Sequence, residues 1–330
     1  MNSNRRGLRA LAATAVLALG LAACSSSGGA GEETGSSDRV AAAQDSGITI
    51  AMVTHEAPGD TFWDKIRAGA EDAAAVHGID LKYSANPEAG QQATLIDNAV
   101  DSQVDGIAVT LSKPDPLAPA VQRAVEAGIP TVAFNSGIDD WERVGAEMYF
   151  GSDETLAGKS AGERLTEAGV QKALCVVQEQ GSVALEARCA GVKSTFPNTE
   201  NLNVNGTDLP SVQQTISSKL QEDPDIDFII TLGAPFAIVA LDAVQDAGSD
   251  AQVATFDLNA EAAQAIADGD ITFSVDQQPY VQGYLAVSAL WLKLTNGNDI
   301  GGGQPVLTGP SFVDETNIDQ ILPYAENNTR

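Results

Sequence analysis

The strongest constraint on the fold is an alternation of short apolar runs with longer segments of helical period. Between the runs, Ala, Leu, Ile and Val recur three or four residues apart, as on the buried face of a helix. Continuous apolar strands that alternate with helices predict an α/β fold with parallel sheets covered by helices on both faces. The runs span residues 48–53, 80–84, 106–111, 130–135, 172–177, 202–206, 227–232, 252–257 and 271–276.

The two halves of this pattern resemble each other. The segment VDGIAVTL…AVQRAVEAGIPTVAFN is similar to IDFIITL…IVALDAVQDAGSDAQVATFD, and the spacing from Asp105 to Asn135 equals that from Asp227 to Asp257. Composition shared by two strand–helix–strand units is an alternative explanation. A repeated unit predicts two α/β domains that are built alike.

Polar residues follow several of the apolar runs. Ligands of parallel sheets bind beyond the carboxyl ends of the strands, where loops and helix N-termini converge. These residues are therefore candidate binding residues. They are Asp60, Asn135, Asp257, Asp276 and Gln277.

The N-terminus has the pattern of an export signal. Three arginines precede an apolar run over residues 11–22, which is followed by Ala23 and Cys24. We interpret residues 1–23 as a signal peptide, because the run is too short for a permanent membrane span. Leu21-Ala22-Ala23-Cys24 resembles the bacterial lipobox, which predicts lipidation of Cys24; a chance cysteine is the alternative. Residues 24–47 are rich in Ser and Gly and predict a flexible tether.

Length and charge limit the kinds of partner. About 280 of the 330 residues follow the tether, enough for two ordinary domains. The formal net charge of −27 disfavours nucleic acid as a partner, since such a surface repels phosphate backbones. The acidity otherwise indicates solubility rather than a substrate.

Two cysteines remain apart from Cys24. In an exported protein, Cys175 and Cys189 predict a disulfide, and two reduced buried thiols are the alternative. Two cysteines and two scattered histidines are too few for a metal site. We therefore expect neither a metal nor a cofactor.

Several segments together carry a family resemblance. They are FWDKIRAGAEDAA, IPTVAFN, GSDETLAGKSAGE, ARCAGV, TFDLN and ITFSVDQQPYVQGYLA, in this order along the chain. In order and spacing the chain resembles the periplasmic sugar-binding proteins of the ribose-binding type, the solute receptors of ABC importers. The resemblance implies two Rossmann-like domains with parallel sheets joined by a three-strand hinge, the type I periplasmic binding protein fold.

The resemblance also implies a set of ligand-binding residues. It places Phe62 and Trp63 as the aromatic pair at the start of the first helix, and Gln277 at the hinge. The full set implied is Asp60, Phe62, Trp63, Asn135, Ser136, Arg188, Leu209, Asp257 and Gln277. The ribose-type pattern has Asn in place of Asp60, Asp-Arg in place of Asn135-Ser136, and Asn in place of Gly233. Ribose itself is therefore disfavoured, and DQQPYVQGYL looks most like receptors for sugars and small polyols.

The residue types fit that ligand class. Sugars and polyols present hydroxyls around an apolar carbon skeleton, so planar groups such as Asp, Asn, Gln and Arg can each serve two hydroxyls. An aromatic face packs against the C–H patch, and Phe62 or Trp63 supplies it. The alternative is that Phe62 packs in the core and Trp63 covers the helix start.

Other candidates also have structural alternatives. Asp257 is either a strand-end ligand or a helix N-cap. Arg188 is either a hydroxyl donor or a surface arginine on a helical segment. His55 ends the first strand and either lines the mouth of the cleft or is a packed, hydrogen-bonded histidine.

The sequence gives little support for catalysis. AGKS at 157–160 resembles the end of a phosphate loop, but Asp153 occupies the place where that motif needs Gly. We interpret this segment as a crossing strand that runs into a helix over residues 154–168. No nucleophile elbow, metal cluster or convincing His–nucleophile pair is present in the sequence. A carboxylate-dependent secreted carbohydrate-active enzyme is a distant alternative.

These observations predict an exported solute receptor that is not an enzyme. We expect a monomer, anchored by lipidated Cys24 to the outer face of the cell membrane, that captures a small neutral sugar or polyol and delivers it to ABC permease subunits. Closure would bend linkers near Ser152, Gln277 and Thr308. A sensor coupled to a membrane signalling protein is an alternative, whereas a DNA-binding repressor of this fold would need a helix-turn-helix in place of the signal. The expected N-terminal lobe is 48–152 plus 278–307, and the C-terminal lobe is 153–277 plus 308–330.

Overall fold

The computed structural model describes residues 44–330. The predicted signal peptide, Cys24 and residues 24–43 of the predicted tether lie outside the described residues. Within 44–330, no helix combines the length and the apolar composition that a membrane crossing requires.

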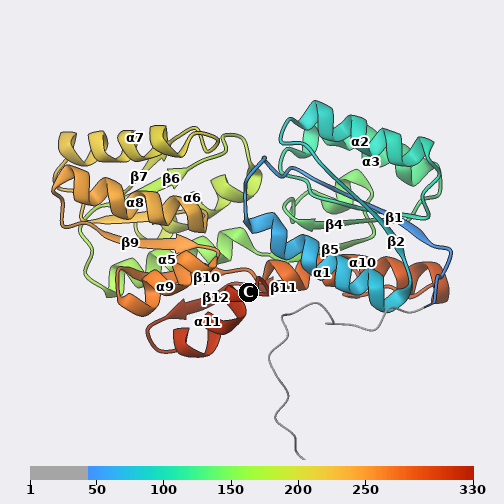
Figure 1. Ribbon diagram of the computed structural model, residues 1–330. Coiled ribbons are helices and arrows are strands. Elements are labelled where there is room, and N and C mark those ends of the chain that lie inside the picture. Colours follow the sequence, from blue (N-terminus) through green and yellow to red (C-terminus); the bar gives the residue numbers. More distant parts are fainter. Residues whose placement is uncertain (1–43) are drawn as a thin grey trace, which may run out of the picture. The chain divides into compact units, whose positions relative to one another are not determined.

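The first sheet contains six strands in the order β11-β5-β4-β3-β1-β2, all of them parallel. Its strands are β1 (Thr49–Thr54), β2 (Asp80–Ala85), β3 (Gly106–Val109), β4 (Thr131–Asn135), β5 (Met148–Ser152) and β11 (Val306–Gly309). One face is covered by α1 (Phe62–His77) and α10 (Pro279–Asn296), and the other by α2 (Ala89–Asp101), α3 (Pro114–Glu126) and the short α4 (Trp141–Val144) (Figure 1).

The second sheet repeats this architecture in the order β12-β10-β9-β8-β6-β7. Its strands are β6 (Ala173–Val177), β7 (Thr199–Asn203), β8 (Phe228–Thr231), β9 (Gln252–Phe256), β10 (Ile271–Asp276) and β12 (Ser311–Asp314). Helices α5 (Glu154–Glu167) and α6 (Val183–Thr195) cover one face. The other face carries α7 (Leu209–Glu222), α8 (Ala234–Ala247), α9 (Ala260–Asp268) and α11 (Ile318–Glu326).

The predicted α/β fold with two similar sheets is confirmed, with two differences in detail. Strand β12 pairs antiparallel with β10, so the second sheet is not wholly parallel. The strand expected at 202–206 lies at Thr199–Asn203. It ends before Asn205, because the Asn205 side chain begins a turn by accepting from the Thr207 amide at 3.3 Å.

The chain passes between the two sheets three times. The passages follow Ser152 at the end of β5, Asp276 at the end of β10, and Gly309 at the end of β11. The first leads directly into α5, where the Asp153 carboxylate caps the helix by accepting from the Leu156 amide at 2.8 Å. These three connections form the expected hinge.

Glycine allows close helix contacts beside the hinge. A Cβ on Gly158 of α5 would lie 2.1 Å from the Arg188 carbonyl oxygen of α6, and a Cβ on Gly69 of α1 would lie 2.0 Å from the Tyr280 carbonyl oxygen of α10. Only glycine permits these approaches. The first brings the start of α5 against the part of α6 that carries Arg188.

Candidate functional site

A cavity of about 870 Å³ lies at the carboxyl ends of the strands of both sheets, within the described residues. Its walls come from the β1–α1 and β6–α6 loops, from the ends of β4, β9 and β10, and from the starts of α7 and α8. This volume suits a small organic ligand. Of the ten expected ligand-binding residues, the nine that line it are His55, Asp60, Phe62, Trp63, Asn135, Arg188, Leu209, Asp257 and Gln277.

Ser136 is the expected residue that does not line the cavity. It is buried, and its carbonyl accepts from the Leu111 amide at 3.2 Å. Leu209 lines the cavity at the first position of α7 and is 37% exposed.

The loop before α1 places one carboxylate and two aromatic rings at the cavity wall. Asp60 Oδ1 accepts from the Phe62 amide at 3.1 Å, and burial raises the pKa of its carboxyl group. Trp63 is 3% exposed and belongs to the apolar core under β1, with its ring edge-on to Phe62 at 5.2 Å. Phe62 is partly buried at the margin of that core. Both rings therefore contact the core and also line the cavity. Packing in the core and contact with a ligand are compatible for Phe62 and for Trp63.

His55 is hydrogen-bonded as well as being in the cavity wall. Its amide donates to Thr110 Oγ1 at 3.1 Å, and its Nδ1 lies 2.7 Å from the same hydroxyl. Burial lowers the pKa of the imidazole to about 4, with opposing contributions from Glu179 and Lys113. A neutral ring at physiological pH follows.

Asn135 and Gln277 connect the two sheets at the hinge side of the cavity. The Asn135 Nδ2 donates to Gln277 Oε1 at 3.2 Å and to Gln282 Oε1 at 3.1 Å. Both of its amide hydrogens are thereby used, which leaves its Oδ1 as an acceptor. Gln282 of α10 in turn donates to Gln277 Oε1 at 2.9 Å and to Thr308 Oγ1 at 3.0 Å.

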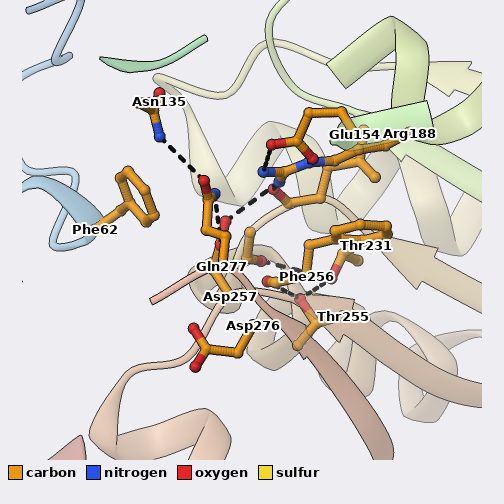
Figure 2. A network of polar contacts seen from close by, with 12 residues as sticks. Phe62, Asn135, Glu154, Arg188, Thr231, Thr255, Phe256, Asp257, Asp276 and Gln277 are labelled. Carbon is orange, nitrogen blue, oxygen red and sulfur yellow. Dashed lines mark hydrogen bonds and ion pairs between the residues drawn. The ribbon is translucent and has the colours of Figure 1, made fainter. Parts of the chain in front are cut away.

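Asp257 continues this network in the second sheet (Figure 2). Its Oδ1 accepts from Gln277 Nε2 at 2.8 Å, and its Oδ2 lies 3.3 Å from Arg188 Nη1. Burial raises the pKa of the Asp257 carboxyl group to about 6, although Arg188 and Gln277 both act to lower it. The N-cap interpretation of Asp257 is wrong, because Asn259 caps α9 by accepting from the Ala262 amide at 2.7 Å.

Arg188 is 3% exposed, so the surface-arginine alternative is wrong. Its Nε donates to Glu154 Oε2 at 2.6 Å and its Nη2 to Glu154 Oε1 at 3.1 Å, while Nη1 also donates to the Leu232 carbonyl at 3.1 Å. The guanidinium lies 4.7 Å from the centre of the Phe256 ring. Burial acts to lower the pKa of Arg188, but the Glu154 and Asp257 carboxylates outweigh it and the pKa is raised.

The predicted disulfide between Cys175 and Cys189 is present. It joins β6 to α6 at the residue that follows Arg188. The bond therefore attaches α6, the helix that carries Arg188, to the second sheet.

Sequence reasoning missed three buried residues near the site. Glu154 is 3% exposed, Gln282 is fully buried, and Lys65 is 1% exposed, with a pKa lowered by burial. Each lies on a helix where polar residues usually face solvent, and the partners of Glu154 and Gln282 are distant in sequence. The one available signal was the position of Glu154, immediately after the predicted crossing strand.

Known proteins share both sequence and structure with this chain. Residues 50–299 match the periplasmic binding protein domain family. A xylose/arabinose-binding protein of Sulfolobus acidocaldarius is 25% identical over 83% of this chain and 72% of its own length. A xylitol-binding protein of Mycolicibacterium smegmatis is 23% identical over 96% of this chain and 87% of its own length.

A solved structure gives a closer likeness. The crystal structure of a carbohydrate transporter from Acidothermus cellulolyticus 11B, in complex with myo-inositol, is 55% identical and has a TM-score of 0.85 over 86% of this chain and 99% of its own. These relatives are named for binding or transport, which confirms the expectation that the chain is not an enzyme. The resemblance in the sequence is likewise confirmed, and the chain belongs to the periplasmic binding protein domain family.

Proposed function

We propose that this protein is the extracytoplasmic receptor of an ABC importer and that it captures a small neutral sugar or polyol. The observation that carries the proposal is the network Asn135–Gln277–Asp257–Arg188 along the cavity wall (Figure 2). It offers carboxylate and amide acceptors together with guanidinium and amide donors, the set that ligand hydroxyls require. Phe62 and Trp63 supply apolar faces for the carbon skeleton.

The names of the relatives support the ligand class. The 55% identical protein was crystallised with myo-inositol, and other relatives are named for pentoses and xylitol. A cyclic polyol has hydroxyls in every direction and no charge. We therefore propose myo-inositol as the first ligand to test.

Capture would proceed by hinge closure without chemistry. We propose the lobes 48–152 plus 278–307 and 153–277 plus 308–330, joined near Ser152, Gln277 and Thr308. Ligand contacts come from both lobes, since Asn135 and Asp257 belong to different sheets. A ligand that touches both lobes stabilises the closed form relative to the open form.

Anchoring and delivery complete the proposal. Lipidated Cys24 would hold the protein at the outer face of the membrane as a monomer, with residues 24–47 as the tether to the permease. Mass spectrometry of the exported chain tests this directly. A diacylglyceryl group on Cys24, absent from Cys24→Ala, is expected; a released chain that starts elsewhere would contradict the anchor.

The ligand class is tested by a thermal-shift screen of the purified protein. Pentoses, hexoses, tetritols, pentitols and inositols are compared with amino acids and nucleosides, each well above the expected dissociation constant, because a ligand that binds only the native state raises the melting temperature. A shift with a sugar or polyol is expected. Shifts confined to amino acids or nucleosides would refute the proposed class.

A further inference from the structure

Both cations in the cavity wall are already paired with carboxylates. The charged side chains among the described lining residues are four carboxylates and two cations. Lys113 Nζ lies 3.2 Å from Glu179 Oε1, and Arg188 contacts Asp257. The lining therefore has no uncommitted positive charge for an anionic ligand.

The positive charge of Arg188 is paired with two carboxylates, Glu154 and Asp257. A guanidinium has five N–H donors, and four of them are used by Glu154, Asp257 and the Leu232 carbonyl. One N–H remains for a ligand, enough for a hydroxyl but not for two-point binding of a carboxylate or phosphate.

Glu154 supplies most of this compensation from behind the wall. Its side chain is 4% exposed, does not line the cavity, and places both oxygens on Arg188. It is also the first residue of α5, where the partial positive charge of a helix N-terminus favours a carboxylate. Glu154 therefore forms a two-point ion pair with Arg188 from behind the cavity wall.

We propose that Glu154 is a specificity-determining residue which makes the cavity reject anionic polyhydroxy compounds, such as sugar acids and sugar phosphates. The inference rests on the proposed function and deepens it. With Glu154 and Asp257 on one guanidinium, an approaching anion meets net negative charge in a buried setting, where repulsion is weakly screened. Neutral polyols meet no such barrier and use the single remaining N–H.

A matched pair of ligands isolates charge from shape. D-glucuronate and D-glucuronamide have the same skeleton and differ at physiological pH by one negative charge. Each is titrated in competition with myo-inositol, or with another neutral compound from the screen if that binds better. On the wild-type protein the acid is expected to compete at least tenfold less well than the amide.

The substitution Glu154→Gln tests the residue itself. It keeps the size of the side chain and removes the charge, so Arg188 is left with one compensating carboxylate. We expect glucuronate to bind at least tenfold more tightly than to the wild type. The control Glu167→Gln removes one charge from the exposed surface of the same helix and leaves the acid-to-amide ratio unchanged. The double variant Glu154→Gln/Arg188→Gln loses the gain, because the unmasked cation is gone.

The outcomes separate the two proposals. If the wild type binds no neutral sugar or polyol, the proposed function is wrong. If neutral ligands bind but Glu154→Gln shows no gain for the acid, or Glu167→Gln shows the same gain, the role of Glu154 is refuted whatever the amide does. Should Glu154→Gln fail to fold, the wild-type comparison decides, because equal competition by glucuronate and glucuronamide would refute the rejection of anions.

Discussion

Asn135 and Asp257 occupy equivalent positions in the two sheets, and both have a backbone φ of 64°. Asn135 ends β4, and Asp257 follows the last residue of β9. Asn and Asp adopt this left-handed conformation more readily than other residues with a side chain. In the internal repeat of the sequence, Asn135 lies as far from Asp105 as Asp257 lies from Asp227. Each of the two residues lines the cavity from its own sheet.

Two substitutions of Asn135 separate the role of its side chain from that of its backbone. Ala and Gly both remove the amide, but Ala also carries a cost of roughly 1–2 kcal/mol in the left-handed region. Greater chain entropy offsets part of the advantage of Gly. We expect both variants to lose ligand binding and Asn135→Gly to be at least as stable as Asn135→Ala in urea unfolding. A clearly more stable Ala variant would contradict the backbone assignment.

Gln282 is expected to hold Asn135 and Gln277 in their binding orientations. Replacing it with Leu removes the buried hydrogen bonds that Gln282 makes to Asn135, Gln277 and Thr308. At about 0.5–1.5 kcal/mol for each bond, we expect a loss of about 2–4 kcal/mol in the free energy of unfolding. Urea unfolding measures that loss, and titration should show weaker ligand binding even at temperatures where the variant is folded. A variant as stable as wild type would show that the network is not needed.

The stability of the protein should depend on pH through His55. Its pKa is about 4 in the folded protein and ordinarily 6.5, so its contribution is complete above pH 6.5 and is lost as the pH falls toward 4. The pKa of Asp257 is raised to about 6, so its carboxyl group makes the protein less stable as the pH rises from 4 to 6, the opposite of the effect of His55. The contribution of His55 is therefore isolated by comparing wild type with a His55 variant at each pH. The stability advantage of wild type over His55→Gln should shrink by about 3 kcal/mol from pH 7 to pH 4. The same difference in unfolding free energy between wild type and His55→Gln at pH 7 and at pH 4 would be inconsistent with a buried neutral ring.

The imidazole of His55 faces few charged groups, which makes this measurement interpretable. Glu179 raises its pKa and Lys113 lowers it, while Thr110 accepts or donates one hydrogen bond and Trp63 packs at 4.7 Å. Glu179→Gln is the matched control. It should displace the His55 transition to lower pH without removing it.

The loops that carry Lys113 and Glu179 should retain the ligand by closing the cavity. Besides their ion pair, the Val183 amide donates to the Ser112 carbonyl at 3.0 Å, so the β3–α3 loop contacts both the β6–α6 loop and the first residue of α6. Partly exposed ion pairs contribute about 0.2–1 kcal/mol. Lys113→Ala is therefore expected to raise the dissociation rate by about two- to fivefold in stopped-flow fluorescence, with little change in the association rate. Lys159→Ala, an exposed lysine on α5, is the control; equal effects of both variants would count against a specific contact.

Periodicity in the sequence was sufficient to predict most of the strands and the two similar halves, because buried parallel strands are continuous apolar runs; β5 and β11 were not among the predicted runs. The predicted position of β7 was shifted because Leu202 is the one apolar residue in this strand, and the neighbouring Val204 was included in the predicted strand. The antiparallel β12 is four residues long and follows β11 after Pro310, too short for a period to appear.

The candidate site was predictable where strand ends and resemblance coincide, as for Asn135 and Asp257. The residues behind it were harder to predict, because only its position after the crossing strand marks Glu154, and nothing local distinguishes a buried Gln282 from a solvated helix residue. Glu154 and Arg188 are 34 residues apart, and Asn135 and Gln282 are 147 apart. Only the packing of α5 on α6, and of α10 beside β4, brings these partners together.

Calorimetric titration of the purified protein with myo-inositol tests the central claim most directly. The account predicts saturable binding at one site and loss of measurable binding in Asp257→Ala. In a parallel fluorescence titration, the emission of Trp63, which lines the cavity, is expected to change. Affinity for myo-inositol or another neutral sugar or polyol that is unchanged in both Asp257→Ala and Arg188→Ala would contradict the site. No binding of any neutral sugar or polyol by the wild type would contradict the function.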